Sequence, residues 1–122
     1  MILHDATIRI KNLRLRTYIG FNDDEIKNKQ DVVINAVIKY DATRAADTDA
    51  VDNALNYKTV TKAIIRLVEN NRFLLLEKLT GDILALCAEH PWVKWAEVEV
   101  DKPYALRFSD SVSLSIACSK ED

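Results

Sequence analysis

The chain of 122 residues contains only two glycines, two prolines and two histidines. Glycine and proline mark turns and loops, so their scarcity leaves little room for long flexible connections or for a linker between domains. No apolar run approaches the ~18 residues that a membrane-spanning helix needs. No glycine-rich phosphate loop and no nucleophile elbow is present. We therefore expect a single domain over residues 1–122 with no membrane partner.

Excess positive charge is absent as well. Lysine and arginine total 17 against 19 aspartates and glutamates, which gives a net charge of −2. A general nucleic-acid binder needs a basic surface to displace counterions, so we expect no nucleic-acid partner. The first residues, Met1–Asp5, open no apolar stretch of the kind that a signal peptide carries. This favours a cytoplasmic protein.

Cysteine and histidine are too few and too scattered to indicate a metal centre. Cys87 and Cys118 lack the spacing of a metal knuckle or a redox pair, and both lie in apolar patterns that favour buried free thiols. His4 and His90 show no zinc-ligand spacing. We therefore expect no metal site, and any chemistry must come from Lys, Tyr, Glu or Asp side chains.

Alternation of apolar and polar residues predicts four strands, over residues 7–16, 31–40, 95–101 and 112–118. In the first strand the apolar phase shifts by one residue at Lys11-Asn12, which indicates a β-bulge. Helical spacing of apolar residues predicts helices over 57–70, capped by Asn56, and from Leu76 to Cys87, ended by Pro91. Residues 21–30 are expected to form a loop, and residues 43–53 an irregular segment with a short helical turn.

The predicted order is ββααββ, which is typical of an α+β fold with two helices on one face of a four-stranded antiparallel sheet. Four strands leave two open edges, and open edges invite pairing with another chain. A closed ring of subunits would remove those edges.

Two charged residues stand out because each allows two interpretations. Glu77 lies beside the apolar stripe at the start of the second helix, where the helix dipole favours a carboxylate. In a dry pocket it could instead accept two parallel hydrogen bonds from an amidine-like edge. Lys102 follows the third strand, where a lysine is usually solvated. If it faces a pocket, desolvation lowers its pKa and makes it an acid–base group.

Tyr57 and Glu25 are further candidates. Tyr57 opens the first helix, where it either packs as an aromatic side chain or exchanges a proton or hydrogen bond with a ligand. Glu25 is most simply a solvated acid in the loop before the second strand.

Taken together, these residues resemble the dihydroneopterin aldolase / dihydroneopterin triphosphate 2'-epimerase family. Each motif is weak alone, but four occur in the family's order along nearly the whole chain. They are Gly20 followed by Glu25 and Gln30, then Asn56-Tyr57, then Leu75-Leu76-Glu77, and finally Val100-Asp101-Lys102-Pro103.

The resemblance implies a tunnelling fold, in which the sheets of a ring of subunits close into a barrel and two tetrameric rings stack as a homo-octamer. A small-molecule pterin would bind between adjacent subunits, with Glu77 and the backbone near Leu76 holding the pterin edge. Leu55, Asn56 and Tyr57 would come from the neighbouring subunit. Lys102, Glu25 and bound water would handle protons, and no cofactor is implied.

The family chemistry is a retro-aldol cleavage of the C1'–C2' bond, with the dihydropterin ring as the electron sink. Releasing the aldehyde is the aldolase outcome, with 6-hydroxymethyl-7,8-dihydropterin and glycolaldehyde as products in folate biosynthesis. Re-adding it from the other face gives the 2'-epimer, dihydromonapterin triphosphate. The Ala105-Leu106-Arg107 segment resembles the epimerase branch, whereas Pro103 resembles the aldolases.

The epimerase is the favoured interpretation and the aldolase the first alternative. A second alternative, from another functional class, is a non-catalytic pterin-binding or assembly module. In the epimerase, Arg107, with Lys27 or Lys29, is expected to contact the triphosphate; otherwise Arg107 is an ordinary surface charge.

Overall fold

The computed structural model describes residues 1–120. Four long strands form most of a curved sheet: β1 (Ala6–Ile19), β2 (Gln30–Tyr40), β4 (Val93–Lys102) and β5 (Val112–Ser119). A two-residue strand, β3 (Arg72–Phe73), pairs in parallel with the end of β1, and all other pairings are antiparallel, in the order β3-β1-β2-β4-β5. The α+β prediction with four main strands is confirmed, and β3 is an addition to it.

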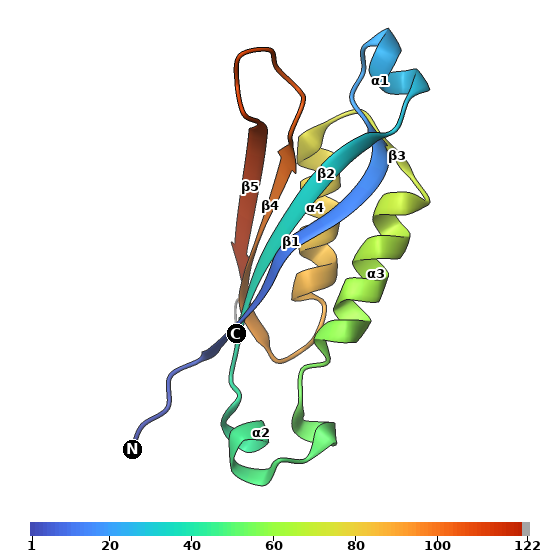
Figure 1. Cartoon of the computed structure of the whole chain (residues 1–122). Coiled ribbons are helices and arrows are strands. Elements are labelled where there is room, and N and C mark those ends of the chain that lie inside the picture. Colours follow the sequence, from blue (N-terminus) through green and yellow to red (C-terminus); the bar gives the residue numbers. More distant parts are fainter. Residues whose placement is uncertain (121–122) are drawn as a thin grey trace.

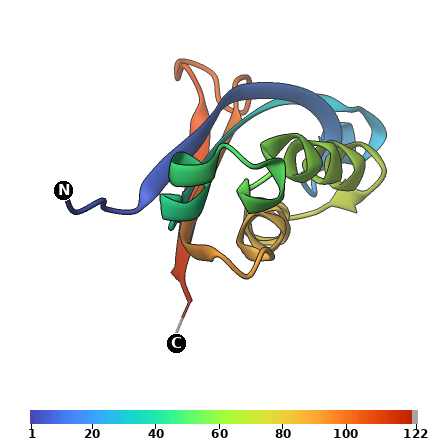
Figure 2. The ribbon, with the colours of Figure 1, turned by 90° about the horizontal axis from the view of Figure 1, so that it is seen from below.

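Two long helices, α3 (Tyr57–Glu69) and α4 (Leu76–Ala88), cover one face of this sheet, as Figures 1 and 2 show. The predicted N-cap of α3 is confirmed, because Asn56 Oδ1 accepts hydrogen bonds from the backbone nitrogens of Lys58 and Thr59. None of the helices within residues 1–120 combines the length and apolar character needed to cross a membrane.

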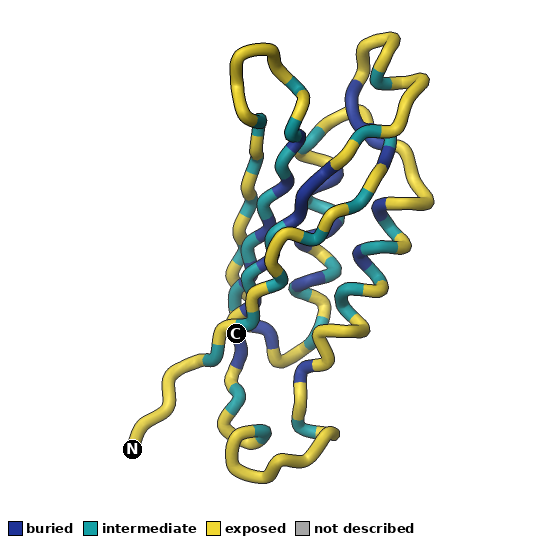
Figure 3. The backbone as a smooth tube through the Cα atoms, viewed as in Figure 1, coloured by how far each residue is buried: buried dark blue, intermediate teal, exposed yellow. Residues whose placement is uncertain are grey.

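The core lies between the helices and the strands. The side chains of β2 and β4 that point to the helices are buried, and they pack against buried residues of α3 and α4; the largest are Ile34, Ile38, Val98, Val100, Ile64, Leu79 and Ile83. Figure 3 shows this buried band running along the sheet, with exposed chain at both ends of the molecule. Period-two burial along β4 explains why its alternation was readable from the sequence.

The predicted bulge in β1 is confirmed. The register with β2 shifts between Ile10 and Leu13, and Asn12 adopts a positive φ of 53°. Asparagine tolerates this left-handed conformation better than most residues. The Asn12 backbone nitrogen donates to Asn35 Oδ1 at 2.9 Å, so a side chain replaces the ladder bond that the bulge removes.

The prediction that residues 21–30 form a loop is wrong. A short helix, α1 (Asp23–Lys27), follows β1, and Gln30 already belongs to β2. A helix of five residues is too short to show an apolar period, which is why the pattern missed it. The segment expected to be irregular contains α2 (Thr43–Thr48) and a 3₁₀ turn, η1 (Val51–Asn53).

Two strand edges are open within residues 1–120. β5 has β4 as its only neighbour, and β1 is covered by β3 only at Tyr18 and Ile19. Each edge presents unpaired backbone groups that can form a ladder with another chain.

Candidate active site

A lysine–glutamate pair forms the centre of the candidate site. Lys102 is the last residue of β4, and its side chain is only about 10% exposed. Its Nζ lies 2.6 Å from Oε2 of Glu25, which comes from α1. The two residues are 77 positions apart in the chain. The fold therefore joins two of the three predicted catalytic residues in one ion pair.

Glu25 is held in place by its neighbours along the chain. Asn22 caps α1 and accepts a hydrogen bond from the Glu25 backbone nitrogen at 2.9 Å. Gln30 Nε2 donates to Glu25 Oε2 at 3.1 Å and to the carbonyl oxygen of Ile19 at 2.6 Å. Asn22 thus fixes the Glu25 backbone, and Gln30 orients its carboxylate.

Gly20 leaves the space that the Glu25 carboxylate occupies. Its φ of 127° lies in a region that side-chain-bearing residues rarely adopt. A Cβ atom built on Gly20 would fall 2.1 Å from Cδ of Glu25. The glycine of the Gly20–Glu25–Gln30 motif is therefore required by the close approach of the carboxylate.

The pair also sets the charge of Glu25. Partial burial raises the pKa of this carboxyl, but hydrogen bonds from Lys102 and Gln30, together with the positive charge of Lys102, outweigh it. The net result is a pKa below the ordinary value of 4.5. Glu25 is therefore ionised at neutral pH and can accept a hydrogen bond or a proton.

This lowered pKa predicts a pH-dependent contribution to stability. A carboxyl whose pKa is lower in the folded state stabilises the fold above its unfolded pKa, and that contribution is lost as the pH falls through the folded pKa. The gap in unfolding free energy between the wild type and Glu25→Gln should stay constant from about pH 8 to pH 6 and shrink below about pH 4.5. Urea unfolding across this range measures it, and a gap that persists unchanged to about pH 3 would contradict the prediction.

Glu77 lies near the same end of the molecule. It is the second residue of α4, and its side chain is exposed and makes no hydrogen bond or ion pair with any residue of 1–120. The strand β3 links the segment before α4 to the end of β1, because the Gly20 backbone nitrogen donates to the Phe73 carbonyl oxygen at 3.0 Å. That bond brings the start of α4 to the turn that precedes Glu25 (Figure 1).

The backbone around Leu76 is available for a ligand. Leu75, at the N-cap position of α4, gives no side-chain hydrogen bond to the first turn. Leu74 and Leu75 are 61% and 50% exposed, although both are large and apolar. An uncapped helix start offers backbone N–H donors, and the exposed leucines beside it offer an apolar surface. A flat ring with a polar edge can contact both.

The other predicted site residues lie at the opposite end of the molecule. Leu55 is buried, Asn56 caps α3 and Tyr57 begins it, and Tyr57 is 55% exposed. The far end of α3 lies beside β1, because Thr17 Oγ1 donates to the Val68 carbonyl oxygen at 2.6 Å. A helix of this length spans about 20 Å. One chain therefore does not bring Tyr57 to Lys102 (Figure 1).

Arg107 lies in the turn between β4 and β5, at the same end as Lys102. It is exposed, and its guanidinium carbon lies 5.2 Å from the ring centroid of Phe108. Lys27 lies in the last turn of α1, and Lys29 follows that helix, with its Nζ 5.8 Å from the ring centroid of Tyr18.

Gln30 and Arg72 also support the site, although neither is among the predicted site residues. The spacing of Gly20, Glu25 and Gln30 was the available signal for Gln30. Arg72 stacks its guanidinium 3.8 Å from the ring centroid of Tyr18 and donates to the carbonyl oxygen of Ile26 at 3.2 Å. It thereby ties α1 to β3, and no local sequence pattern predicts this contact.

Comparisons with known proteins identify relatives of the chain. The chain is 59% identical to the dihydroneopterin triphosphate 2'-epimerase of Escherichia coli K12 over 112 residues, which is 92% of this chain and 93% of the relative. It is 32% identical to the dihydroneopterin aldolase of Haemophilus influenzae over 107 residues, 88% and 91% of the two chains.

The fold has close counterparts among solved structures. The crystal structure of Escherichia coli dihydroneopterin aldolase in complex with neopterin matches with a TM-score of 0.87 and 25% identity, and it covers 93% of this chain and 99% of the other. The family model described as FolB, dihydroneopterin aldolase, matches residues 8–117. The chain belongs to this dihydroneopterin aldolase family.

Proposed function

We propose that this protein is a dihydroneopterin triphosphate 2'-epimerase, an isomerase. The observation that carries the proposal is the difference in identity between the two branches of the family: 59% to an epimerase against 32% to an aldolase, over nearly the same part of the chain. The substrate is a small pterin, and the E. coli aldolase with the same fold has been solved in complex with neopterin.

The Lys102–Glu25 pair supports a retro-aldol route. Removal of the 2'-hydroxyl proton lets the C1'–C2' bond break, and the bonding electrons enter the dihydropterin ring while the 2'-carbon becomes an aldehyde. A lysine and a carboxylate 2.6 Å apart can pass that proton between them or to a bound water. Rotation of the aldehyde and re-formation of the same bond returns the proton and gives the epimer.

Glu77 is the proposed anchor of the pterin. A free carboxylate can accept two parallel hydrogen bonds from the N3–H and 2-amino groups of the ring. The backbone near Leu76, at the uncapped start of α4, adds polar contacts along the same edge.

The placement of Tyr57 supports a site divided between subunits. Leu55, Asn56 and Tyr57 reach a substrate held by Lys102 and Glu77 only if they come from an adjacent copy, so the proposed enzyme is a homo-oligomer. The open edges of β1 and β5 provide the surfaces for a ring, and the proposed assembly is a cytoplasmic octamer of two stacked tetrameric rings.

Complementation between two inactive variants tests the shared site. Lys102→Ala and Tyr57→Ala should each be inactive, whereas their co-expressed mixture should regain about a quarter of the wild-type activity from sites that receive both intact residues by random pairing. Light scattering gives the mass of the same mixture. A mixture that stays inactive while it forms mixed oligomers would contradict a site shared in this way.

Product analysis tests the function itself. Chromatography after incubation with dihydroneopterin triphosphate should show its 2'-epimer without released aldehyde. Formation of 6-hydroxymethyl-7,8-dihydropterin from dihydroneopterin would instead favour the aldolase, for which Pro103 after Lys102 is the supporting feature. Tight pterin binding without turnover would favour a non-catalytic module.

Arg107 is proposed to contact the triphosphate from the subunit that carries Lys102. Its position on the exposed turn after β4, at the same end of the molecule as α1 with Lys27 and Lys29, supports that role. An unchanged KM for the triphosphate in Arg107→Ala would remove it from the site.

A further inference from the structure

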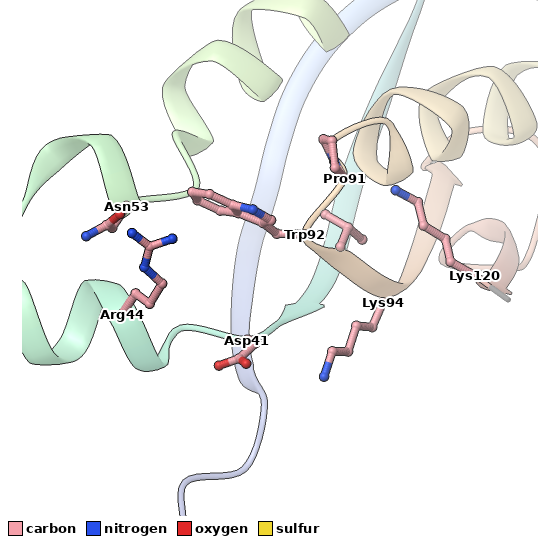
Figure 4. A pocket seen from close by; sticks show the side chains of 8 residues that line it. Asp41, Arg44, Asn53, Pro91, Trp92, Lys94 and Lys120 are labelled. Atoms are coloured by element: carbon pink, nitrogen blue, oxygen red, sulfur yellow. The ribbon is translucent and has the colours of Figure 1, made fainter. Parts of the chain in front are cut away.

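A cavity at the end of the molecule opposite Lys102 has no part in the site described so far. It has a volume of about 390 Å³ and lies where α2 and η1 face the start of β4. Figure 4 shows the side chains that line it, among which the polar and aromatic ones are Asp41, Arg44, Asn53, Trp92, Lys94 and Lys120.

The lining of the cavity carries a net positive charge, although the net charge of the whole chain is negative. Three cations and one carboxylate give its lining a formal charge of +2, whereas the whole chain carries −2. The carboxylate, Asp41, is engaged at the start of α2, because its Oδ1 accepts hydrogen bonds from the nitrogen and hydroxyl of Thr43 at 2.9 and 2.6 Å. Lys94 Nζ is already paired with Asp5 Oδ1 at 3.1 Å. Arg44 and Lys120 are therefore the cations that remain for an anion.

Arg44 is the strongest of these donors. Its guanidinium makes no hydrogen bond or ion pair with any residue of 1–120, and Figure 4 shows it pointing from α2 toward Asn53 and Trp92. A guanidinium carries five N–H donors in a planar fork that matches the oxygens of a phosphate. A free guanidinium that points into a cavity is the arrangement that a phosphate group would complete.

The walls beside Arg44 are fixed. Asn53 Nδ2 donates to Thr48 Oγ1 at 2.9 Å. The Trp92 backbone nitrogen donates to His90 Nδ1 at 3.1 Å, and the two rings lie 4.6 Å apart between centroids. On the other side, Lys120 Nζ donates to the His90 carbonyl oxygen at 2.7 Å. These contacts hold the lining in place, so binding an anion orders little besides Arg44 itself.

The position of the cavity suggests whose phosphate it binds. A neighbouring cavity of about 340 Å³ shares Pro91 with it and is lined by Leu55 and Asn56. Under the proposed function, Leu55, Asn56 and Tyr57 face the pterin that an adjacent subunit holds. Asn53 stands only two residues before Leu55, so the electropositive cavity adjoins the segment that meets the substrate.

We propose that the cavity around Arg44 binds the triphosphate of the substrate seated on the adjacent subunit. This inference rests on the proposed function. It places phosphate contacts on both sides of the shared site, with Arg107 on the subunit that carries Lys102 and Arg44 on the subunit that carries Tyr57.

Paired affinities test the proposal without relying on turnover. Calorimetry with neopterin triphosphate and with neopterin gives the preference of each variant for the phosphorylated ligand. Arg44→Ala should lower that preference roughly tenfold to hundredfold, since it removes charge-assisted hydrogen bonds to the phosphate, and Lys120→Ala should lower it less. Lys62→Ala, which removes an exposed cation from α3, is the matched control and should leave it unchanged.

An equal preference in Arg44→Ala and the wild type would overturn the proposal. Inorganic tripolyphosphate supplies the second arm: if it binds in an Arg44-dependent way while the pterin preference stays the same, the cavity takes a free anion and the proposal fails. Failure of the proposed function has a different signature, namely pterin binding without epimer formation, and it leaves the affinity test of the cavity in force.

Discussion

Replacement of Glu77 with alanine should weaken pterin binding by about 2–5 kcal/mol, or roughly 30-fold to several thousandfold in Kd, because two charge-assisted hydrogen bonds are lost together. The carboxylate has no partner within residues 1–120, so the mutation breaks no contact of the free protein. The loss should therefore appear in ligand affinity, measured by calorimetry with neopterin, and hardly at all in the fold.

The competing explanation of Glu77 makes a different prediction. A glutamate in the first turn of a helix interacts favourably with the helix dipole, which is worth about 0.3–1 kcal/mol of stability at an exposed site. On that account Glu77→Ala would lower the unfolding free energy slightly and leave neopterin affinity as it was. Glu77→Gln separates the two, because it keeps the shape and one acceptor but removes the charge. An affinity for Glu77→Gln between those of the wild type and the alanine variant identifies the anchor.

The strands were predictable because their faces differ so clearly. In β4, alternate residues from Ala96 to Lys102 are buried, so the period of two is present in the sequence itself. The bulge at Asn12 was predictable for the same reason, as a single extra residue moves every later side chain to the other face. β3 has only two residues and offers no period, and its pairing with β1 follows from the turn after α3.

The sequence signal for helix α1 is a cap rather than an apolar period. Asn22 followed three residues later by Glu25 has the spacing of a helix cap, and in the structure Asn22 Oδ1 accepts from the Glu25 nitrogen. Reading that cap would have placed Glu25 in a fixed first turn rather than in a solvated loop. The local sequence thus fixes the backbone of Glu25, and the fold brings Lys102 to its carboxylate.

The contact between Glu25 and Lys102 was not derivable from local pattern. Family resemblance grouped the two residues, but their 2.6 Å contact depends on the order of strands β1, β2 and β4, which brings the ends of β1 and β4 to one end of the sheet. The separation of Tyr57 from that pair is a property of the same topology. Because of this separation, Tyr57 can join the pair only if it comes from a second subunit.

Lys102→Ala should slow the chemical step by about 10²–10⁴-fold, the range that a positioned acid–base group contributes, while pterin affinity stays within a few-fold of the wild type. The expectation follows from placement, since Lys102 is buried and directed at Glu25 rather than at the start of α4 where the pterin edge is proposed to bind. Single-turnover kinetics with dihydroneopterin triphosphate gives the chemical rate, and neopterin calorimetry gives the affinity.

A second substitution separates proton transfer from simple electrostatics. Lys102→Arg keeps a positive charge beside Glu25 and so preserves the ion pair, but an arginine does not give up its proton in a protein. If Lys102 works by exchanging a proton, the arginine variant should be nearly as slow as the alanine variant although its stability is close to that of the wild type. If Lys102 serves only to orient and neutralise Glu25, the arginine variant should recover most of the rate. A near-normal single-turnover rate in Lys102→Arg would therefore transfer the proton-handling role to Glu25, bound water and the phenol of Tyr57.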